Sequence, residues 1–244
     1  MKDLIKITEQ ILNDRYPGAD VIFLAGSLLR GEGTPYSDLD LVVIFERLSH
    51  AWRESFIFQG YPVEAFVNDP ETFNYFISEI GRPSGRSPLA HMVAEGVEVP
   101  GPTEISRLVK RIACDLIAAG PPKLSDEDER KLRYSITNLI DDIRQPRSRE
   151  ELAASGAELY GALANYYFRM NGLWSATNKS IPRTFSKADP NLHSRFREGF
   201  EELFARGRSD KVILLAEEIL NQHGGFLFDG YKNDAEPDNR KQLS

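Results

Sequence analysis

The sequence has almost no cysteine and no long apolar run. Its 244 residues include one cysteine, Cys114, which excludes an internal disulfide and fits a reducing compartment. No apolar run approaches the ~18 residues that a membrane-spanning helix requires. The first residues also lack the apolar block of a signal peptide. We therefore expect a cytoplasmic protein without a membrane partner.

The sequence is also poor in positive charge and in histidine. Thirty Lys and Arg residues stand against 37 Asp and Glu residues, which gives a formal net charge of −7. Lys and Arg side chains that neutralise phosphates drive binding to nucleic-acid backbones, so this balance argues against nucleic acid and favours a cationic partner. The four histidines are scattered without the spacing of zinc ligands. No Ser-His-Asp arrangement and no Gly-Lys-Thr phosphate loop is present.

The periodicity of apolar residues predicts an α+β region followed by a helical one. In the first region we predict helices over 3–15, 70–80 and 89–93, and strands over 21–25, 38–45 and 61–67. From about residue 103 strand signals fade, and helices are predicted over 103–118, 125–145, 149–171, 189–206 and 209–223. Gly120-Pro121-Pro122 interrupts these signals, so the border falls within 100–124. We set the domains at 1–110 and 111–233, with a loose tail at 234–244.

A glycine and a serine follow the first predicted strand. Gly26 has no side chain, so a phosphate can approach the backbone closely there. Ser27 adds a hydroxyl donor, and the next residues can open a helix whose N-terminal amides favour anions. Arg30 is a further candidate for a phosphate contact, although a surface arginine fits as well. A Gly-Ser pair alone is typical of an ordinary turn.

Two aspartates begin the second predicted strand. Residues two apart on a strand point to the same face, so Asp38 and Asp40 project together while Leu39 and Leu41 enter the core. Two carboxylates this close repel each other unless a cation lies between them. Hard oxygen ligands suit Mg²⁺, which also binds substrate phosphates. The pair beside a Gly-Ser turn therefore predicts a site for a nucleoside triphosphate and a metal ion.

The segment from Phe23 to Val43 resembles the signature of the DNA polymerase β-like nucleotidyltransferase superfamily. That signature is an apolar residue, Gly-Ser, a spacer of about ten residues, and then Asp-apolar-Asp-apolar; Ser37, Gly31 and Thr34 resemble its bacterial branch. The resemblance implies a mixed sheet with helices, and a third carboxylate on a later strand. Glu64 occupies the matching position, and an exposed strand acid is the alternative interpretation.

The resemblance also implies the roles of these residues. Asp38, Asp40 and Glu64 would hold Mg²⁺, with Glu64 either completing the metal site or accepting the proton of the attacking hydroxyl. The residues implied to contact ATP or another nucleoside triphosphate are Gly26, Ser27, Ser37 and Arg30.

The helical region resembles that of the aminoglycoside nucleotidyltransferases of antibiotic resistance. In those enzymes it closes over the acceptor and supplies acids, so Asp141 and Asp142 are candidate catalytic bases; a solvated acidic face is the alternative. The segment 172–183 is similar to a recurring one in these enzymes, which makes Lys179 a candidate triphosphate contact. The expected reaction moves a nucleoside monophosphate to a hydroxyl of an aminoglycoside and releases pyrophosphate. Related enzymes often pair, so a homodimer is one expected state.

Two other functions stay open at this point. A protein- or RNA-directed nucleotidyltransferase, such as an antitoxin-like enzyme that adenylylates its partner, would use the same chemistry. The RNA version predicts a basic track that the composition does not supply, and the antitoxin version usually needs only a minimal core. A catalytically silent nucleotide-binding regulator would be expected to lack an acid of the pair or the Gly-Ser turn, and neither is missing.

Overall fold

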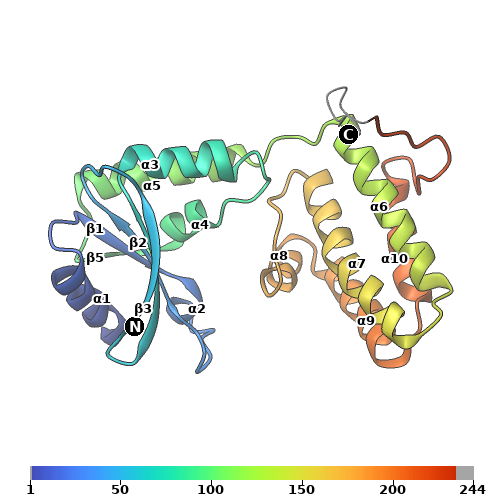
Figure 1. Ribbon diagram of the computed structural model, residues 1–244, viewed down its shortest axis with the longest axis horizontal. Helices are drawn as coiled ribbons and strands as arrows, with labels where there is room; N and C mark the ends of the chain where they lie inside the picture. Colours follow the sequence, from blue (N-terminus) through green and yellow to red (C-terminus); the bar gives the residue numbers. More distant parts are fainter. Residues whose placement is uncertain (1, 235–244) are drawn as a thin grey trace, which may run out of the picture. The chain divides into compact units, whose positions relative to one another are not determined.

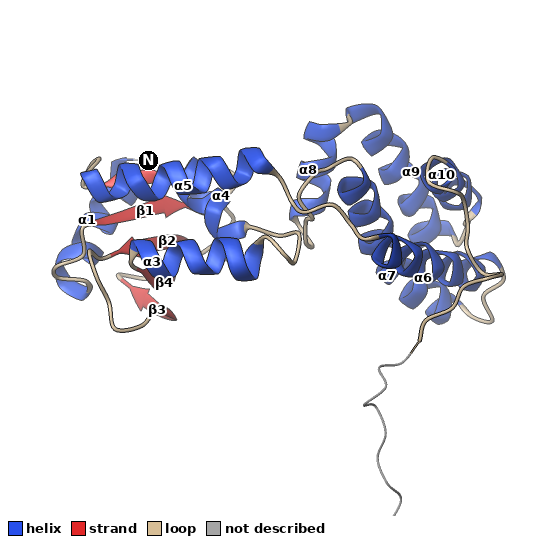
Figure 2. Cartoon of the chain, turned by 90° about the horizontal axis from the view of Figure 1, so that it is seen from above, coloured by secondary structure: helices blue, strands red, loops and turns tan. Residues whose placement is uncertain are grey.

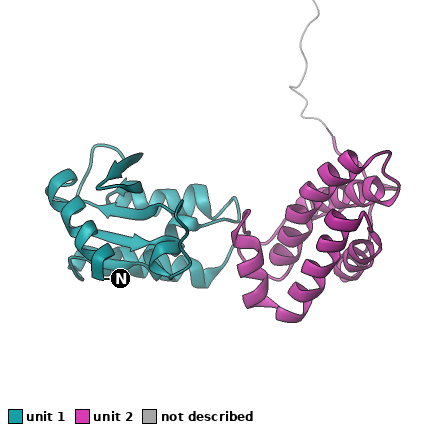
Figure 3. Cartoon of the chain, turned by 90° about the horizontal axis from the view of Figure 1, so that it is seen from below, with its two compact units in different colours: residues 1–122 teal, residues 123–244 magenta. Residues whose placement is uncertain are grey.

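The computed structural model describes residues 2–234. The chain forms two compact units, residues 1–122 and residues 123–244 (Figure 3). Strands are confined to the first unit, and the described part of the second contains helices and loops (Figure 2). The units divide after Pro122, which lies within the border region 100–124 given by the sequence analysis and beyond the domain limit that it set at residue 110. The tail predicted over 234–244 lies, apart from Asp234, outside the described residues.

The first unit combines a mixed sheet with helices, as the sequence predicted. Its elements are α1 (Lys2–Arg15), β1 (Val21–Ala25), α2 (Gly26–Leu29), β2 (Leu39–Ile44), β3 (Trp52–Phe58), β4 (Tyr61–Asn68), α3 (Pro70–Tyr75), the π-helix η1 (Phe76–Gly81), α4 (Pro88–Glu95), β5 (Val97–Val99) and α5 (Glu104–Ala119). The strand order is β3-β4-β2-β1-β5. Strands β2 and β4 run parallel, and the other neighbours run antiparallel.

Successive side chains of the strands β1 and β2 enter two different cores, because strand residues alternate between the faces of a sheet. On one face Ile22 and Leu24 of β1 pack with Ile11 of α1. On the other face Val21 and Phe23 pack with residues of α3, η1, α4 and α5, which lie together on that side of the sheet (Figure 1). Residue 110 lies inside α5, and this packing on the sheet explains why α5 belongs to the first unit.

The second unit is a bundle of helices around an aromatic core. Its elements are α6 (Asp126–Arg144), α7 (Arg149–Met170), α8 (Ser180–Ala188), α9 (Pro190–Arg206) and α10 (Asp210–Asn221). The buried Phe185 of α8 stacks on Tyr167 with a centroid distance of 5.0 Å and also contacts Phe168 and Phe196. The sequence analysis did not predict α8 as a helix. Among the described helices, none combines the length and the apolarity that a bilayer crossing requires.

Candidate active site

Three neighbouring strands bring the predicted acids to one place on the sheet. Asp40 of β2 pairs with Ala25, the last residue of β1, and with Glu64 of β4. The odd-numbered residues of β2 and β4, such as Leu41 and Val63, enter the core beside α1. Asp40 and Glu64 therefore share the opposite face of the sheet.

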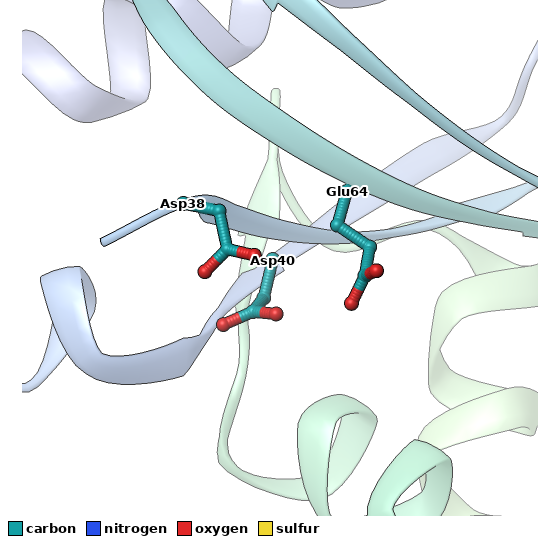
Figure 4. A group of neighbouring side chains, drawn as sticks. All are labelled: Asp38, Asp40 and Glu64. Atoms are coloured by element: carbon teal, nitrogen blue, oxygen red, sulfur yellow. The ribbon is translucent and has the colours of Figure 1, made fainter. Parts of the chain in front are cut away.

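The side chains of Asp38, Asp40 and Glu64 converge in front of these strands (Figure 4). One carboxylate oxygen from each residue lies within 4.8 Å of the others, and all three residues are half-buried. Asp38 directly precedes β2, so the two aspartates project together, as their spacing predicted. Three ionised carboxylates so close together repel one another, and a cation between them removes this cost. The donor set consists of hard oxygen ligands, which suits Mg²⁺ better than Zn²⁺.

Gly26 lies directly against the acidic group. Its φ of +85° is in a region that residues with a side chain rarely adopt. A β-carbon on Gly26 would lie 1.9 Å from Oδ2 of Asp40 and 2.7 Å from its Cγ. The glycine is therefore required both by the backbone conformation and by the position of the Asp40 carboxylate. The helix that follows, α2, spans only the four residues Gly26–Leu29.

A hydrogen-bonded loop connects the Gly-Ser turn to the aspartates. Ser27 Oγ donates to Ser37 Oγ at 3.3 Å. Ser37 Oγ also accepts from the backbone N–H of Thr34 at 2.9 Å, and the backbone N–H of Glu32 donates to the carbonyl of Ser27 at 3.0 Å. These bonds fold the loop back onto the turn, so Ser27 and Asp38 belong to one connected structure.

An arginine that the sequence analysis did not single out contacts the third carboxylate. Arg53 of β3 donates from Nε to Oε1 of Glu64 at 3.0 Å, and its Nη2 bonds to the same oxygen. Gly60, between the strands β3 and β4, is a sequence signal from which this contact could have been predicted. Gln59-Gly60 is a two-residue turn in which both residues have positive φ, the conformation of a tight hairpin. Counting outward from this turn places Ser55 opposite Glu64 and Arg53 on the same face.

The other predicted site residues are placed as follows. Arg30 pairs with Glu32 at 3.0 Å and with Glu95 at 4.0 Å, so its guanidinium is already engaged by acids of the first unit. Asp141 and Asp142 lie near the end of α6, and Lys179 is the N-terminal cap residue of α8. These last three residues belong to the second unit, and the acidic group belongs to the first.

Comparison with known families identifies the first unit. Residues 5–81 match the family described as "Nucleotidyltransferase domain". The chain contains a nucleotidyltransferase domain. The match spans β1, β2 and β4 and thus all three acids, and it confirms the prediction of a nucleotidyltransferase. Domains of this kind support transfer of a nucleoside monophosphate and typically use a nucleoside triphosphate and a divalent metal ion.

Comparison with solved structures finds a nucleotidyltransferase-like protein from Exiguobacterium sibiricum 255-15. It is 14% identical in sequence, with a TM-score of 0.42, and the alignment covers 90% of this chain and 75% of that one. A search of curated proteins gave no match.

Proposed function

We propose that the protein is a divalent-metal-dependent nucleotidyltransferase that modifies a small cationic acceptor of the aminoglycoside class. The observation that carries the proposal is the convergence of Asp38, Asp40 and Glu64 within the nucleotidyltransferase domain. Among residues 2–234 this is the one group of three or more acidic, histidine or cysteine side chains placed closely enough to bind a metal ion together. The Gly-Ser turn, which a metal site alone does not need, lies directly beside it.

In this proposal each residue of the site has a defined task. Asp38, Asp40 and Glu64 hold the divalent cation, which when bound neutralises charge on the phosphates. Gly26 leaves the backbone open to a phosphate. The single O–H of Ser27, which donates to Ser37 Oγ in the structure, turns to donate to a phosphate oxygen when the nucleotide binds. The loop bonds around Ser37 keep that hydroxyl beside the aspartates.

The reaction is an exchange of one phosphorus–oxygen bond for another. The oxygen of the acceptor hydroxyl forms a bond to the α-phosphorus. The bond from the α-phosphorus to the oxygen shared with the β-phosphate breaks, and pyrophosphate leaves with that oxygen. The hydroxyl proton passes to a carboxylate, for which Glu64 is the candidate within the first unit. The products are a nucleotidylated acceptor and pyrophosphate.

Two observations support a cationic acceptor. The chain has a formal net charge of −7, and acidic surfaces concentrate positive ligands. In the second unit Asp141, Asp142 and Glu151 line an open hollow of about 300 Å³, together with Arg147, which pairs with Glu151 at 3.7 Å. Asp141 pairs with Arg144 at 3.7 Å, and Asp142 accepts from Ser155 Oγ at 3.4 Å. Both carboxylates remain open to a ligand that enters this hollow.

The test of the chemistry is pyrophosphate release by the purified protein. It should be incubated with Mg²⁺, each nucleoside triphosphate and a panel of aminoglycosides. The masses of the products are then measured by mass spectrometry. We expect an acceptor heavier by one nucleoside monophosphate, and loss of the reaction on chelation of the metal or in Asp40→Asn. Glu71→Gln, which removes an exposed acid of α3, should keep full activity. Equal activity of wild type and Asp40→Asn would contradict the proposed site.

The test of the acceptor uses the same protein with a different substrate pool. Incubation of a cell lysate with α-labelled triphosphate would reveal labelled protein or RNA. If macromolecules are labelled and aminoglycosides stay unmodified, the acceptor is a macromolecule and not a small molecule. The proposed metal site would be unaffected by this result.

A further inference from the structure

The guanidinium of Arg53 is held on the face of the sheet that carries the three acids. Strand β3 is an edge strand, and its residue Arg53 lies opposite Phe66 of β4. The guanidinium carbon lies 5.0 Å from the centre of the Phe66 ring, a cation–π contact. The hairpin register therefore directs one positive charge toward a group of three negative ones.

Arg53 binds only one oxygen of Glu64. Both Nε and Nη2 donate to Oε1, so the guanidinium converges on this atom instead of forming the two parallel bonds of a bidentate pair. The Arg53 side chain is 62% exposed and that of Glu64 is 21% exposed. The arginine can move away into solvent, whereas the carboxylate stays beside Asp40.

This arrangement has a consequence for metal binding. Without a metal ion, Arg53 offsets part of the repulsion among the three carboxylates. A divalent cation that binds the same group must weaken the bond to Arg53 or tolerate a positive charge close by. Exposed ion pairs and screened repulsions of this kind change an equilibrium constant on the order of three- to tenfold.

We infer that Arg53 is a positioning residue that competes with the divalent cation for Glu64, so that the free cation binds weakly in the absence of nucleotide. The inference rests on the proposed metal site. A nucleoside triphosphate, with its negative charge, then favours the cation-bound state, because it adds oxygen ligands and offsets the charge of the guanidinium. Arg53 thereby makes metal binding depend on the presence of the substrate.

The chain offers a matched control on the other face of the same hairpin. Arg15 of α1 pairs with Glu54 of β3, and its guanidinium lies 4.1 Å from the centre of the Phe56 ring. This pair has the same chemistry as the Arg53 pair, an arginine over a phenylalanine and bonded to a glutamate. Glu54 lies opposite Ala65, which enters the core beside α1, so Arg15 does not face the three acids.

The test is a titration of the nucleotide-free protein with Mn²⁺, followed by the electron paramagnetic resonance signal of the free ion. We expect Arg53→Gln to bind Mn²⁺ on the order of three- to tenfold more tightly than wild type. Arg53→Met, which keeps the apolar stem on Phe66, should behave in the same way. Arg53→Lys keeps the charge but not the planar guanidinium, so its affinity should lie between those of wild type and Arg53→Gln. Arg15→Gln should leave the affinity unchanged. The gain in Arg53→Gln should shrink at high salt.

The outcomes separate this inference from the proposed function. Saturable binding that is lost in Asp40→Asn but unchanged or weakened in both Arg53→Gln and Arg53→Met would overturn the competition while leaving the metal site in place. Absence of Mn²⁺ binding in wild type and in both Arg53 variants would overturn the metal site and this inference together. Thermal unfolding of each variant, measured alongside, shows whether the hairpin is still folded.

Discussion

A β-carbon on Gly26 would lie 1.9 Å from Oδ2 of Asp40. This distance is far inside van der Waals contact, and the atoms it would displace belong to a proposed metal ligand. The β1–β2 register gives the reason, since Ala25, the residue before Gly26, pairs with Asp40. The glycine of the Gly-Ser turn thus has a second role besides phosphate access. Its lack of a side chain leaves the space that the Asp40 carboxylate occupies.

Gly26→Ala should therefore damage the metal site. We expect the Asp40 carboxylate to move, with a loss of Mn²⁺ affinity on the order of 10- to 100-fold, the range seen when the support of a metal ligand is removed. The measurement is Mn²⁺ titration of the nucleotide-free protein. Gly18→Ala is the control, because Gly18 also has a positive φ, +93°, but a β-carbon there meets nothing within 4 Å. A matching loss of affinity in Gly18→Ala would show that backbone strain, not the contact with Asp40, is responsible.

Ser27→Ala should weaken binding of the triphosphate. The variant removes the hydroxyl proposed to donate to a phosphate oxygen and also the 3.3 Å bond to Ser37 Oγ. A hydrogen bond to a charged group contributes about 1.5–3 kcal/mol, so we expect roughly a 10- to 100-fold higher Kd for the nucleotide. The measurement is calorimetric titration with a non-hydrolysable triphosphate and Mg²⁺.

Ser37→Ala separates the two roles of Ser27. It removes the partner of Ser27 and the acceptor of the Thr34 N–H but keeps the phosphate donor, so its effect should be smaller. Ser49→Ala, at an exposed serine bonded to His50, should bind like wild type. An unchanged Kd in Ser27→Ala would remove this residue from the proposed phosphate site.

Asp38 and Asp40 could be predicted because their relative position follows from a local rule. Asp38 and Asp40 are two residues apart at the head of an apolar run, and this spacing alone places them on one face. Glu64 followed from the family resemblance, and the register of β2 with β4 places it opposite Asp40. That register joins strands separated by a third strand in the sequence, and no local pattern reports it.

The sequence analysis missed strands in which the pattern of apolar residues is weak. Strand β3 is an edge strand, and its residues from Trp52 to Phe58 are exposed or half-buried. Its only apolar run is the three residues Phe56 to Phe58, which is too short to indicate a strand. Strand β5 has three residues, too few for a periodic signal. Arg53 was missed with β3, because its relation to Glu64 exists only once the hairpin is recognised. Helix α5 looked like the start of the helical region, but its apolar face packs on the sheet.

Asp69 should make the stability of the first unit depend on acidic pH. It is 4% exposed and accepts from the backbone N–H groups of Thr72 at 2.8 Å and Leu48 at 2.9 Å. Burial raises the pKa of the Asp69 carboxyl, but the hydrogen bonds from Thr72 and Leu48 lower it by more, so the pKa lies below the ordinary value. The folded state thus holds the proton less tightly than the unfolded state.

The resulting stabilisation is fully present above the ordinary aspartate pKa of about 3.9 and is lost as the pH falls through the lower folded-state value. Asp69→Asn lacks this charge, so it should be less stable at pH 7 and should lose less stability between pH 5 and pH 3. The measurement is the urea midpoint of the first unit across this range. Parallel pH profiles of the two proteins would count against Asp69 as the source of the dependence.

Phe185→Ala should destabilise the second unit without changing the metal site of the first. Phe185 is buried among aromatic residues of α7 and α9, and truncation of such a side chain costs about 3–5 kcal/mol of unfolding free energy. The core around Phe185 is separate from the two cores that flank the sheet, so Mn²⁺ affinity should stay within about twofold of wild type. Hydrogen exchange in urea, read on peptides from residues 123–234, measures the loss of stability of the second unit.

Leu214→Ala is the control, at a residue of α10 that is 63% exposed. It should change stability by less than about 0.5 kcal/mol. A large fall in Mn²⁺ affinity in Phe185→Ala would show instead that the acids of the first unit depend on an intact helical unit.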